Sequence, residues 1–245
     1  MIAREGESWR LIGEPRFGGI QIVCDHASNR VPEGVDLGIA PELLDLHIAV
    51  DIGVDAVAQI MAQRAGIAAF CARVSRLVCD FNREEGCHTI VPLISDGHAI
   101  PGNDLREEAG YEERYARFFR PYHAALAQLL DEVPPALILS LHSFTPRLAT
   151  SDEARPWQIG VLYNQDDRAA RIAIPLLEAE GLIVGDQLPY SGTTLNATMN
   201  RHAEAEGRPH LGVEIRQDLI SDAAGQAEWA ERMARICNKV ALALG

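Results

Sequence analysis

Short apolar runs alternate with helix-like stretches along this chain, and this alternation is the feature that most narrows its fold. The clearest run, ALILSLHSFTP at residues 136–146, has five aliphatic residues among its first six and follows Pro134 and Pro135. A short uncharged run of this kind is typical of a strand buried on both faces of a parallel sheet. Other expected strands cover residues 19–24, 67–72, 75–81, 157–164, 182–184 and 209–216.

Helical patterns separate these runs. One covers residues 41–66, in two pieces that meet near Gly53, and another begins at Asn103 or Asp104 and continues with a kink past Pro121. Strands that alternate with such helices predict an α/β fold with a mostly parallel sheet covered on both faces. The remaining expected helices cover residues 166–180, 194–207 and 223–244.

Composition narrows the class of protein. The 47 % hydrophobic content suffices for a sizeable core, and with no linker-like stretch or repeat we expect one domain over residues 1–245. A formal charge of −13 argues against sequence-independent binding to nucleic acid or to an anionic membrane surface. The first ten residues lack the apolar segment of a signal peptide, and no stretch approaches the roughly 20 apolar residues of a membrane span. We therefore expect a cytoplasmic protein.

Polar side chains recur where the expected strands end. His26 follows the first strand, Asn82 and Arg83 follow the third, His142 ends the run at 136–146, and Glu214 lies near the end of the last strand. Ligands of open α/β sheets bind beyond the carboxyl ends of the strands, so these residues are site candidates. Each also has a structural interpretation: His142 as a core histidine, Asn82 as a turn former, Arg83 as a surface cation, and Glu214 as the partner of Arg216.

This set of residue types suits a metallohydrolase. Two neutral imidazoles and one further ligand hold Zn²⁺ with a position open for water, whose pKa the metal lowers to about 7. A separate carboxylate can take the proton of the water and pass it to a leaving amine. Arginine suits the binding of a substrate carboxylate and the stabilisation of an oxyanion.

A series of motifs occurs in a fixed order along the chain: HASNRVP, HIAVDIGVDAVA, SRLVCDFNR, SDGHAIPGN, PYH, LHSFTP, RPWQIGVLYN, PYSG and GVEIRQDLI. Taken together, these motifs resemble the N-formylglutamate amidohydrolase family. The resemblance extends over nearly the whole chain and rests on the order of its segments. It implies a three-layer α/β/α fold around a mixed, mostly parallel sheet, and a relationship to the zinc carboxypeptidases and to the aspartoacylase and succinylglutamate desuccinylase group.

The resemblance also implies roles for individual residues. It makes His26 and His142 zinc ligands, and it makes Asn82 and Arg83 the pair that holds the free carboxylate of the substrate. Glu214, in VEIR, takes the place of the general base. Arg76 is our choice for polarising the carbonyl group that is cleaved.

The third zinc ligand is the point at which the chain departs from the wider superfamily. That superfamily has His-x-x-Glu, whereas Asn29, a poor zinc ligand, stands three residues after His26. Asp51 is our preferred ligand, because a helical segment would place it on one face with His47, which could support it. Asp51 could instead cap the following helix, and Asp25 is a further candidate ligand.

Further residues are candidates for contact with the substrate: Ser143, Tyr190 and Arg216. The glycine-containing loops at 96–103 and 189–194 suit closure over a small molecule. A glutamyl substrate would bring a second carboxylate, for which Arg147, Arg201 and Arg216 are the candidate partners. Ser143 is not expected to act as a nucleophile, because no G-x-S-x-G motif surrounds it.

The expected function is that of a zinc-dependent amidohydrolase acting on a small N-acyl amino acid, with N-formylglutamate as the first candidate. Two alternatives remain open at this point. One is a related deacylase or carboxypeptidase-like hydrolase with another substrate. The other is a metal-free module that binds a small anion, which the presence of Asn29 would favour.

Overall fold

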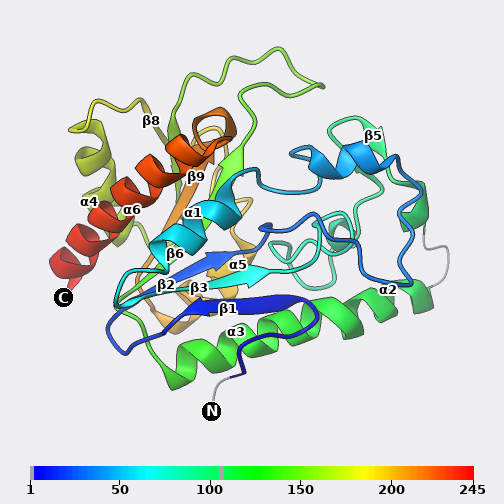
Figure 1. The fold of residues 1–245 in the computed structure, drawn as a ribbon, viewed down its shortest axis with the longest axis horizontal. Coiled ribbons are helices and arrows are strands. Elements are labelled where there is room, and N and C mark those ends of the chain that lie inside the picture. The colour runs from blue at the N-terminus through cyan, green and yellow to red at the C-terminus, as the bar shows by residue number, and fades with distance from the viewer. Residues whose placement is uncertain (1–2, 105–107) are drawn as a thin grey trace.

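A seven-stranded mixed sheet forms the centre of the protein (Figure 1). The computed structural model describes residues 3–104 and 108–245. The strand order is β1-β3-β2-β6-β9-β7-β8, in which β3, β2, β6 and β9 are parallel neighbours, as are β7 and β8. β1 is antiparallel to β3, and β7 is antiparallel to β9. The strands are β1 (Trp9–Gly13), β2 (Ile20–Cys24), β3 (Ile67–Ala72), β6 (Leu137–Phe144), β7 (Ile159–Leu162), β8 (Val184–Asp186) and β9 (His210–Arg216).

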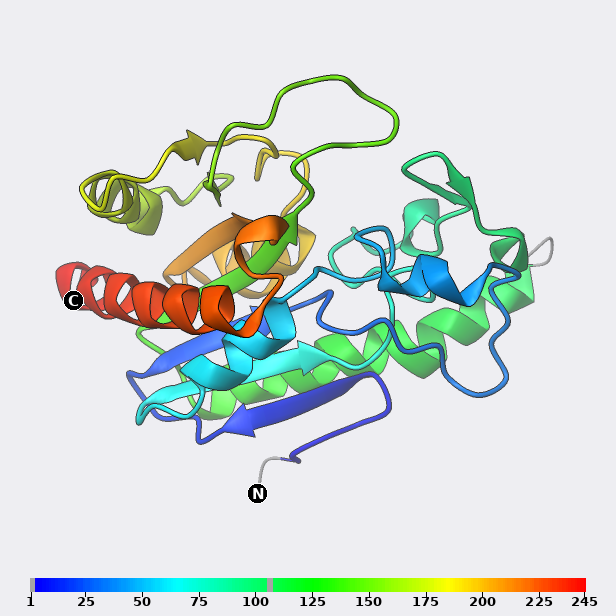
Figure 2. The same cartoon turned by 45° about the horizontal axis from the view of Figure 1, so that its top comes forward.

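Helices cover both faces of the sheet, so the expected three-layer α/β/α architecture is confirmed (Figure 2). One face carries α1 (Val54–Met61), α4 (Arg168–Glu178) and α6 (Ala223–Leu244). The other carries α3 (Arg120–Glu132) and α5 (Ala197–His202). α2 (Glu108–Arg114) precedes α3, and a small hairpin pairs β4 (Ile94–Ser95) with β5 (His98–Ala99). No helix of the described ranges is both long enough and apolar enough to cross a membrane.

The central strand β6 is buried along all eight residues, as its sequence predicts. Leu137, Leu139 and Leu141 pack in the hydrophobic cluster on the α1, α4 and α6 face, whereas Ile138 packs in the cluster on the α3 face. Side chains alternate along a strand. His142 therefore shares the face of Ile138, and Ser143 points to the opposite face.

Three expected elements differ from the structure, and the first is the strand expected at residues 75–81. Residues 75–81 form a buried turn instead of a strand, because the Ser75 hydroxyl donates to the Ala49 carbonyl group and accepts from the Leu77 N–H. Such local side-chain bonds compete with the pairing of strands. The edge of β3 that this segment would have occupied pairs with β1 instead, a strand that we did not expect.

The expected helix at 41–66 is present in two pieces, as expected, but these pieces are short and do not meet near Gly53. Only Pro41–Asp45, as a short 3₁₀ turn, and α1 are helical, and Gly53 begins α1 with a φ of 82°. The expected helix at 194–207 is reduced to α5 and a 3₁₀ turn at Glu204–Glu206. α6, in contrast, has the expected bounds.

The expected kink near Pro121 takes the form of a π-helical turn at Tyr115–Phe119 between α2 and α3. Proline has no N–H group to donate to the preceding turn, which explains the irregularity. The expected start of this helix is only partly described, because residues 105–107 lie outside the described ranges. Asn103 is not a cap there: its buried amide donates to the carbonyl groups of Leu77 and Pro92.

Candidate metal centre and active site

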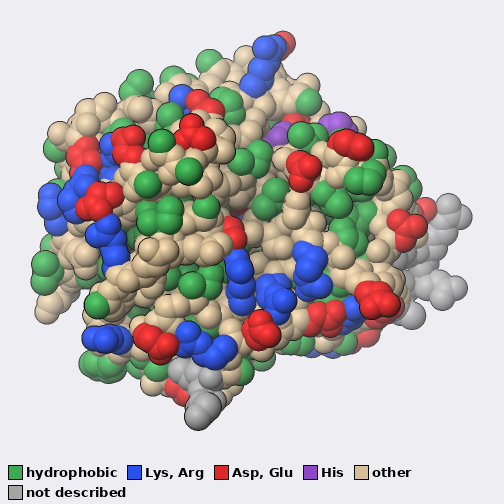
Figure 3. Space-filling model, viewed as in Figure 1, with side chains coloured by type: hydrophobic (Ala, Val, Ile, Leu, Met, Phe, Trp, Pro, Cys, Tyr) green, Lys and Arg blue, Asp and Glu red, His purple; other side chains and the backbone are tan. Residues whose placement is uncertain are grey.

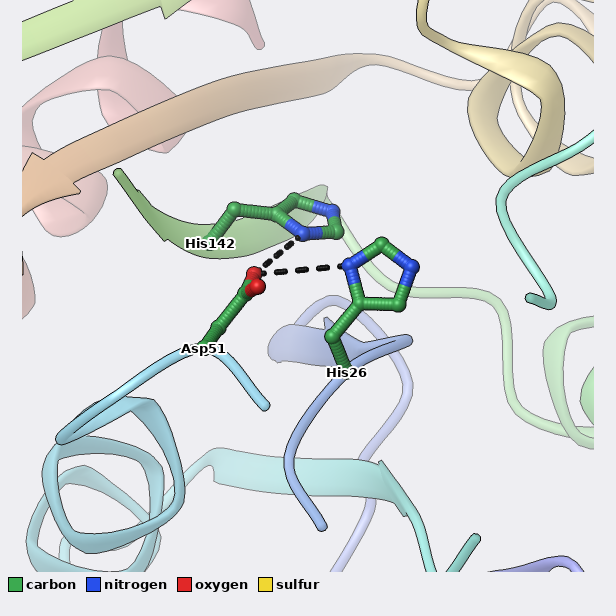
Figure 4. A group of neighbouring side chains, drawn as sticks. All are labelled: His26, Asp51 and His142. Carbon is green, nitrogen blue, oxygen red and sulfur yellow. Dashed lines mark hydrogen bonds and ion pairs between the residues drawn. The ribbon is translucent and has the colours of Figure 1, made fainter. Parts of the chain in front are cut away.

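Three buried side chains from separate segments meet at the carboxyl edge of the sheet (Figure 4). His26 lies in the turn after β2, Asp51 in the loop before α1, and His142 in β6. Nδ1 of His142 lies 2.9 Å from Asp51 Oδ2, and Nδ1 of His26 lies 3.4 Å from the same oxygen. One ligand atom from each residue lies within 4.8 Å of the others, so the group could bind a metal ion.

The arrangement fits a zinc ion. Two atoms bound to one tetrahedral zinc at about 2.0–2.1 Å lie roughly 3.3 Å from each other, and the two distances from Asp51 Oδ2 lie on either side of this value. Nδ1 of His26 is buried and has no hydrogen-bond partner among the described residues. Buried polar atoms without a partner are uncommon, and a bound cation would satisfy this one.

Each imidazole has a carboxylate behind it. His26 Nε2 lies 2.7 Å from Asp80 Oδ1. His142 Nε2 lies 3.7 Å from Asp25 Oδ2, and the other oxygen of Asp25 accepts a hydrogen bond from the Tyr122 hydroxyl. Metal-binding histidines commonly direct their second nitrogen to a carboxylate, which fixes the ring and the tautomer. Asp25, a candidate ligand in the sequence, thus lies behind His142 and outside the group of three.

The electrostatics of this group favour positive charge at its centre. Burial alone would lower the pKa of His142, but its bond to Asp51 and the charges of Asp51, Glu214 and Asp25 raise the pKa to about 9. Burial would raise the pKa of Asp51, yet the two imidazoles hold it well below its usual range. Four carboxyl groups surround two imidazoles here, and a metal cation would balance the same negative charge.

Asp51 is held by its own backbone and by two further donors. Its N–H donates to the carbonyl oxygen of His26 at 3.0 Å. Its carboxylate accepts from the backbone N–H of Ser143 at 3.3 Å and from Arg76 Nη1 at 3.2 Å. It does not cap α1, whose N-cap is Gly53, with no side-chain bond.

The expectation that His47 and Asp51 share a helix face is wrong. Residues 46–53 are not helical, so the spacing of four does not bring the two side chains together. His47 Nε2 instead lies 3.0 Å from Asp96 Oδ2, in the loop between β4 and β5. Asn29 is also engaged elsewhere, because its amide donates to Asp45.

Glu214 faces the same space from the neighbouring strand. The register of β6 and β9 pairs His142 with Glu214. Burial, with the charge of Asp51 adding to it, raises the pKa of Glu214 to about 7, although His142 and Arg76 oppose the shift. Glu214, His142 and Asn82 line a cavity of about 10 Å³, which is close to the room that one water molecule needs.

The two predicted arginines both contact Asp80. Arg76 Nη2 donates to Asp80 Oδ2 at 3.2 Å, and Arg83 Nε lies 3.4 Å from the same oxygen. The Arg76 side chain is about a quarter exposed and joins Asp80 to Asp51. Arg83 lines a separate cavity of about 290 Å³ with His123 and Arg201. The structure thus brings Arg76 to the centre and places Arg83 at its side.

The other three residues predicted to contact the substrate lie in different places relative to the candidate site. The Ser143 hydroxyl points away from the site and donates to the Ile52 carbonyl oxygen. Arg216 binds Asp218 through Nε at 2.8 Å. The Tyr190 hydroxyl accepts from Arg155, and the charges of Glu214 and Arg76 act on its pKa, which burial raises. Of these three predicted residues, Tyr190 alone presents its functional group near the site.

Comparisons with known proteins identify the family. The sequence profile of N-formylglutamate amidohydrolase matches residues 20–221, most of the chain. The chain belongs to the N-formylglutamate amidohydrolase family. No curated protein sequence matches it significantly.

Two solved structures resemble this family member over almost their full lengths. A gene product of Agrobacterium tumefaciens has 28 % identical residues and a TM-score of 0.90, with 98 % of this chain and 96 % of that chain covered. The N-formylglutamate amidohydrolase of Ralstonia eutropha JMP134 has 18 % identical residues and a TM-score of 0.72, with 97 % and 98 % covered. At that identity the second similarity supports the fold alone.

This N-formylglutamate amidohydrolase family member thus carries a His-Asp-His candidate metal centre. Sequence reasoning did not single out Asp80, which contacts His26, Arg76 and Arg83. The sequence signal that could have identified Asp80 is its position two residues before Asn82. Reasoning from strand ends also missed Arg155, because this residue precedes its strand, β7, instead of following one.

Proposed function

We propose that the protein is a zinc-dependent amidohydrolase that hydrolyses N-formylglutamate to glutamate and formate, or a close N-acyl relative to the free amino acid and the carboxylate of its acyl group. The observation that carries this proposal is that Nδ1 of His26 has no hydrogen-bond partner among the described residues and faces the same Asp51 oxygen as Nδ1 of His142. His26, Asp51 and His142 would hold the zinc. Family membership supports the amide substrate.

Zinc in this position would act as a Lewis acid and would lower the pKa of a bound water to about 7. Glu214 accepts the proton of the attacking water and then delivers it to the nitrogen of the departing amine, so that formate and an amino acid leave. A carboxyl group with a pKa of about 7 suits both transfers, because it gains and loses a proton near neutral pH.

The other side chains orient the substrate in this proposal. Arg76, partly exposed between Asp51 and Asp80, donates to the scissile carbonyl oxygen. The Asn82 amide, which lines the small cavity beside Glu214, binds the α-carboxylate with Arg83 from the adjacent cavity. Roles for Ser143 and Arg216 in substrate binding stay predictions, since the hydroxyl and the guanidinium are engaged at Ile52 and Asp218.

The first test combines metal content with hydrolysis. We expect about one zinc per chain in the purified protein and release of formate from N-formylglutamate, with both reduced at least tenfold in His142→Ala. His88→Ala is the matched control, because His88 is exposed and lies outside the group of three. Zinc measured by atomic absorption that stays below 0.1 per chain after zinc is supplied would contradict the proposal and favour a metal-free binding module.

A further inference from the structure

Arg155 is a buried arginine with no anionic partner in the part of the chain that the structure describes. It lies in the connection between β6 and β7, where the residue is 9 % exposed. Its Nη1 donates to the Thr145 carbonyl oxygen at 3.2 Å and to the Tyr190 hydroxyl at 3.0 Å. Its guanidinium carbon lies 5.0 Å from the centre of the Tyr190 ring. In the described ranges, no carboxylate oxygen lies within 4.0 Å of its nitrogens, and Nε and Nη2 make no hydrogen bond.

Buried cations are costly unless they are paired, so a guanidinium in this state indicates a ligand. The three arginines considered from the sequence for a second substrate carboxylate all have protein partners. Arg147 pairs with Asp152, Arg201 with Glu85 and Arg216 with Asp218. Among these four arginines, Arg155 is the one that is buried and has no carboxylate partner in the part of the chain that the structure describes.

The position of Arg155 relates it to the candidate metal centre. Thr145 is the first residue after β6, three residues beyond His142, a separation of about 10 Å along an extended chain. The charges of Glu214, Arg155 and Arg76 all act on the Tyr190 hydroxyl. Arg76 and Arg155 also both act on His47, where they add to burial in lowering the pKa. These effects are consistent with the contact of Arg155 with Thr145, which follows the strand that carries His142.

We propose that Arg155, oriented by Tyr190, binds the side-chain carboxylate of the substrate and so restricts the enzyme to N-acyl dicarboxylic amino acids. This inference rests on the proposed function. In N-formylglutamate, five bonds separate the formyl carbon from the side-chain carboxyl carbon, about 6 Å when extended. A hydrogen bond to the carboxylate adds about 3 Å, so the reach matches the separation of His142 from Thr145.

The test compares an acidic substrate with its neutral isostere. We expect the wild-type enzyme to prefer N-formylglutamate over N-formylglutamine by about 100-fold in kcat/KM, the usual range for a buried charge pair. Arg155→Gln should remove that preference through a raised KM for N-formylglutamate, while kcat/KM for N-formylglutamine stays within about threefold of wild type. Arg155→Lys, which keeps the charge, should restore part of the preference.

Arg147→Gln is the matched control, because Arg147 lies in the same connection but is exposed and paired with Asp152. It should keep the wild-type preference. An equal loss of activity on both substrates in Arg155→Gln would assign Arg155 a purely structural role and overturn the inference. An unchanged preference in that variant would overturn it as well.

A binding measurement separates this inference from the proposed function. Isothermal titration calorimetry would compare glutarate, a dicarboxylate, with pentanoate, its monocarboxylate analogue. We expect wild type to bind glutarate at least tenfold more tightly and Arg155→Gln to bind the two alike. If the preference depends on Arg155 in a protein that hydrolyses no N-formyl amino acid, the inference stands and the proposed function fails. Equal binding of both acids by wild type would overturn the inference.

Discussion

Single carboxyl groups in this centre differ in what surrounds them, and this difference determines their chemistry. Asp51 and Asp80 each face imidazole and guanidinium groups at short distance, which lower their pKa values against the effect of burial. Glu214 has a buried oxygen that finds no hydrogen-bond partner within residues 3–104 and 108–245, and burial raises its pKa to about 7. Asp51 and Asp80 are therefore suited to bind a cation or to orient a histidine, whereas Glu214 is suited to exchange a proton.

Replacement of Glu214 by glutamine tests this division of roles. Glu214→Gln keeps the size of the side chain but removes the proton acceptor, so we expect kcat to fall by about 10²- to 10⁴-fold while zinc content is unchanged. Formate release and atomic absorption would measure the two quantities. Glu178→Gln, an exposed change on α4, should alter neither. Unchanged turnover in Glu214→Gln would exclude Glu214 as the base.

At the scale of elements, the loop that ends at Gly53 determines where Asp51 lies. Gly53 has a φ of 82°, and a Cβ atom there would lie 2.1 Å from the Ile220 carbonyl oxygen. Gly66 has a similar φ of 83°, but a Cβ atom there would meet nothing within 4 Å. The two glycines therefore share the same backbone strain and differ only in the space around them.

This pair allows a matched prediction. Gly66→Ala should cost about 1–2 kcal/mol of unfolding free energy, from the left-handed backbone alone. Gly53→Ala should cost at least about 2 kcal/mol more, because the loop must shift, and it should weaken zinc binding at the adjacent Asp51. Urea unfolding and zinc titration would measure both effects. Equal losses of stability in the two variants would contradict the role of Ile220 in holding this loop.

The elements that could be predicted are those in which one local signal dominates. In β6 and β9, most residues are apolar and few polar residues interrupt them. α6 begins at a favourable N-cap, Asp222, whose side chain accepts a hydrogen bond from the Gly225 N–H. The segment at 75–81 is equally apolar, but Ser75 and the partners of Asp80 turn it into a loop. The two histidines of the candidate metal centre could be predicted from their positions at strand ends, whereas Asp51 was predicted from a helical spacing that the structure does not contain. Asp80 and Arg155 contact residues that are far away in the sequence, so no local sequence pattern predicts their positions.

At the scale of the whole molecule, the layer that contains α3 and α5 holds two neutral histidines. His123 Nε2 donates to the Phe81 carbonyl oxygen at 3.1 Å, so its Nδ1 accepts from His202 Nε2 at 2.9 Å. Burial lowers the pKa of His202 to about 4 and lowers that of His123 well below its ordinary value. The unfolded chain therefore binds more protons than the folded one between pH 6.5 and 4, and stability falls as the pH falls through this window.

We predict that the free energy of unfolding depends less on pH when His202 is replaced. Between pH 7.5 and pH 5, His202→Gln should lose about 2 kcal/mol less unfolding free energy than wild type, because glutamine can donate to His123 without taking a proton. Urea unfolding at the two pH values would measure this. His88→Gln, at an exposed position, serves as the control and should follow wild type. Identical pH dependence in His202→Gln and wild type would contradict the assignment.

The antiparallel direction of β7 has a further consequence for how such an enzyme can change. Because β7 runs against β9, the connection at 145–158 leaves the end of β6 and enters β7 at the same edge of the sheet. It therefore begins and ends beside the candidate metal centre without crossing the core. Insertions or exchanges within it would alter Arg155 and its neighbours but leave the positions of His26, Asp51 and His142 intact. Transplanting this connection between related proteins would thus exchange the surroundings of Arg155 while the candidate metal centre stays unchanged.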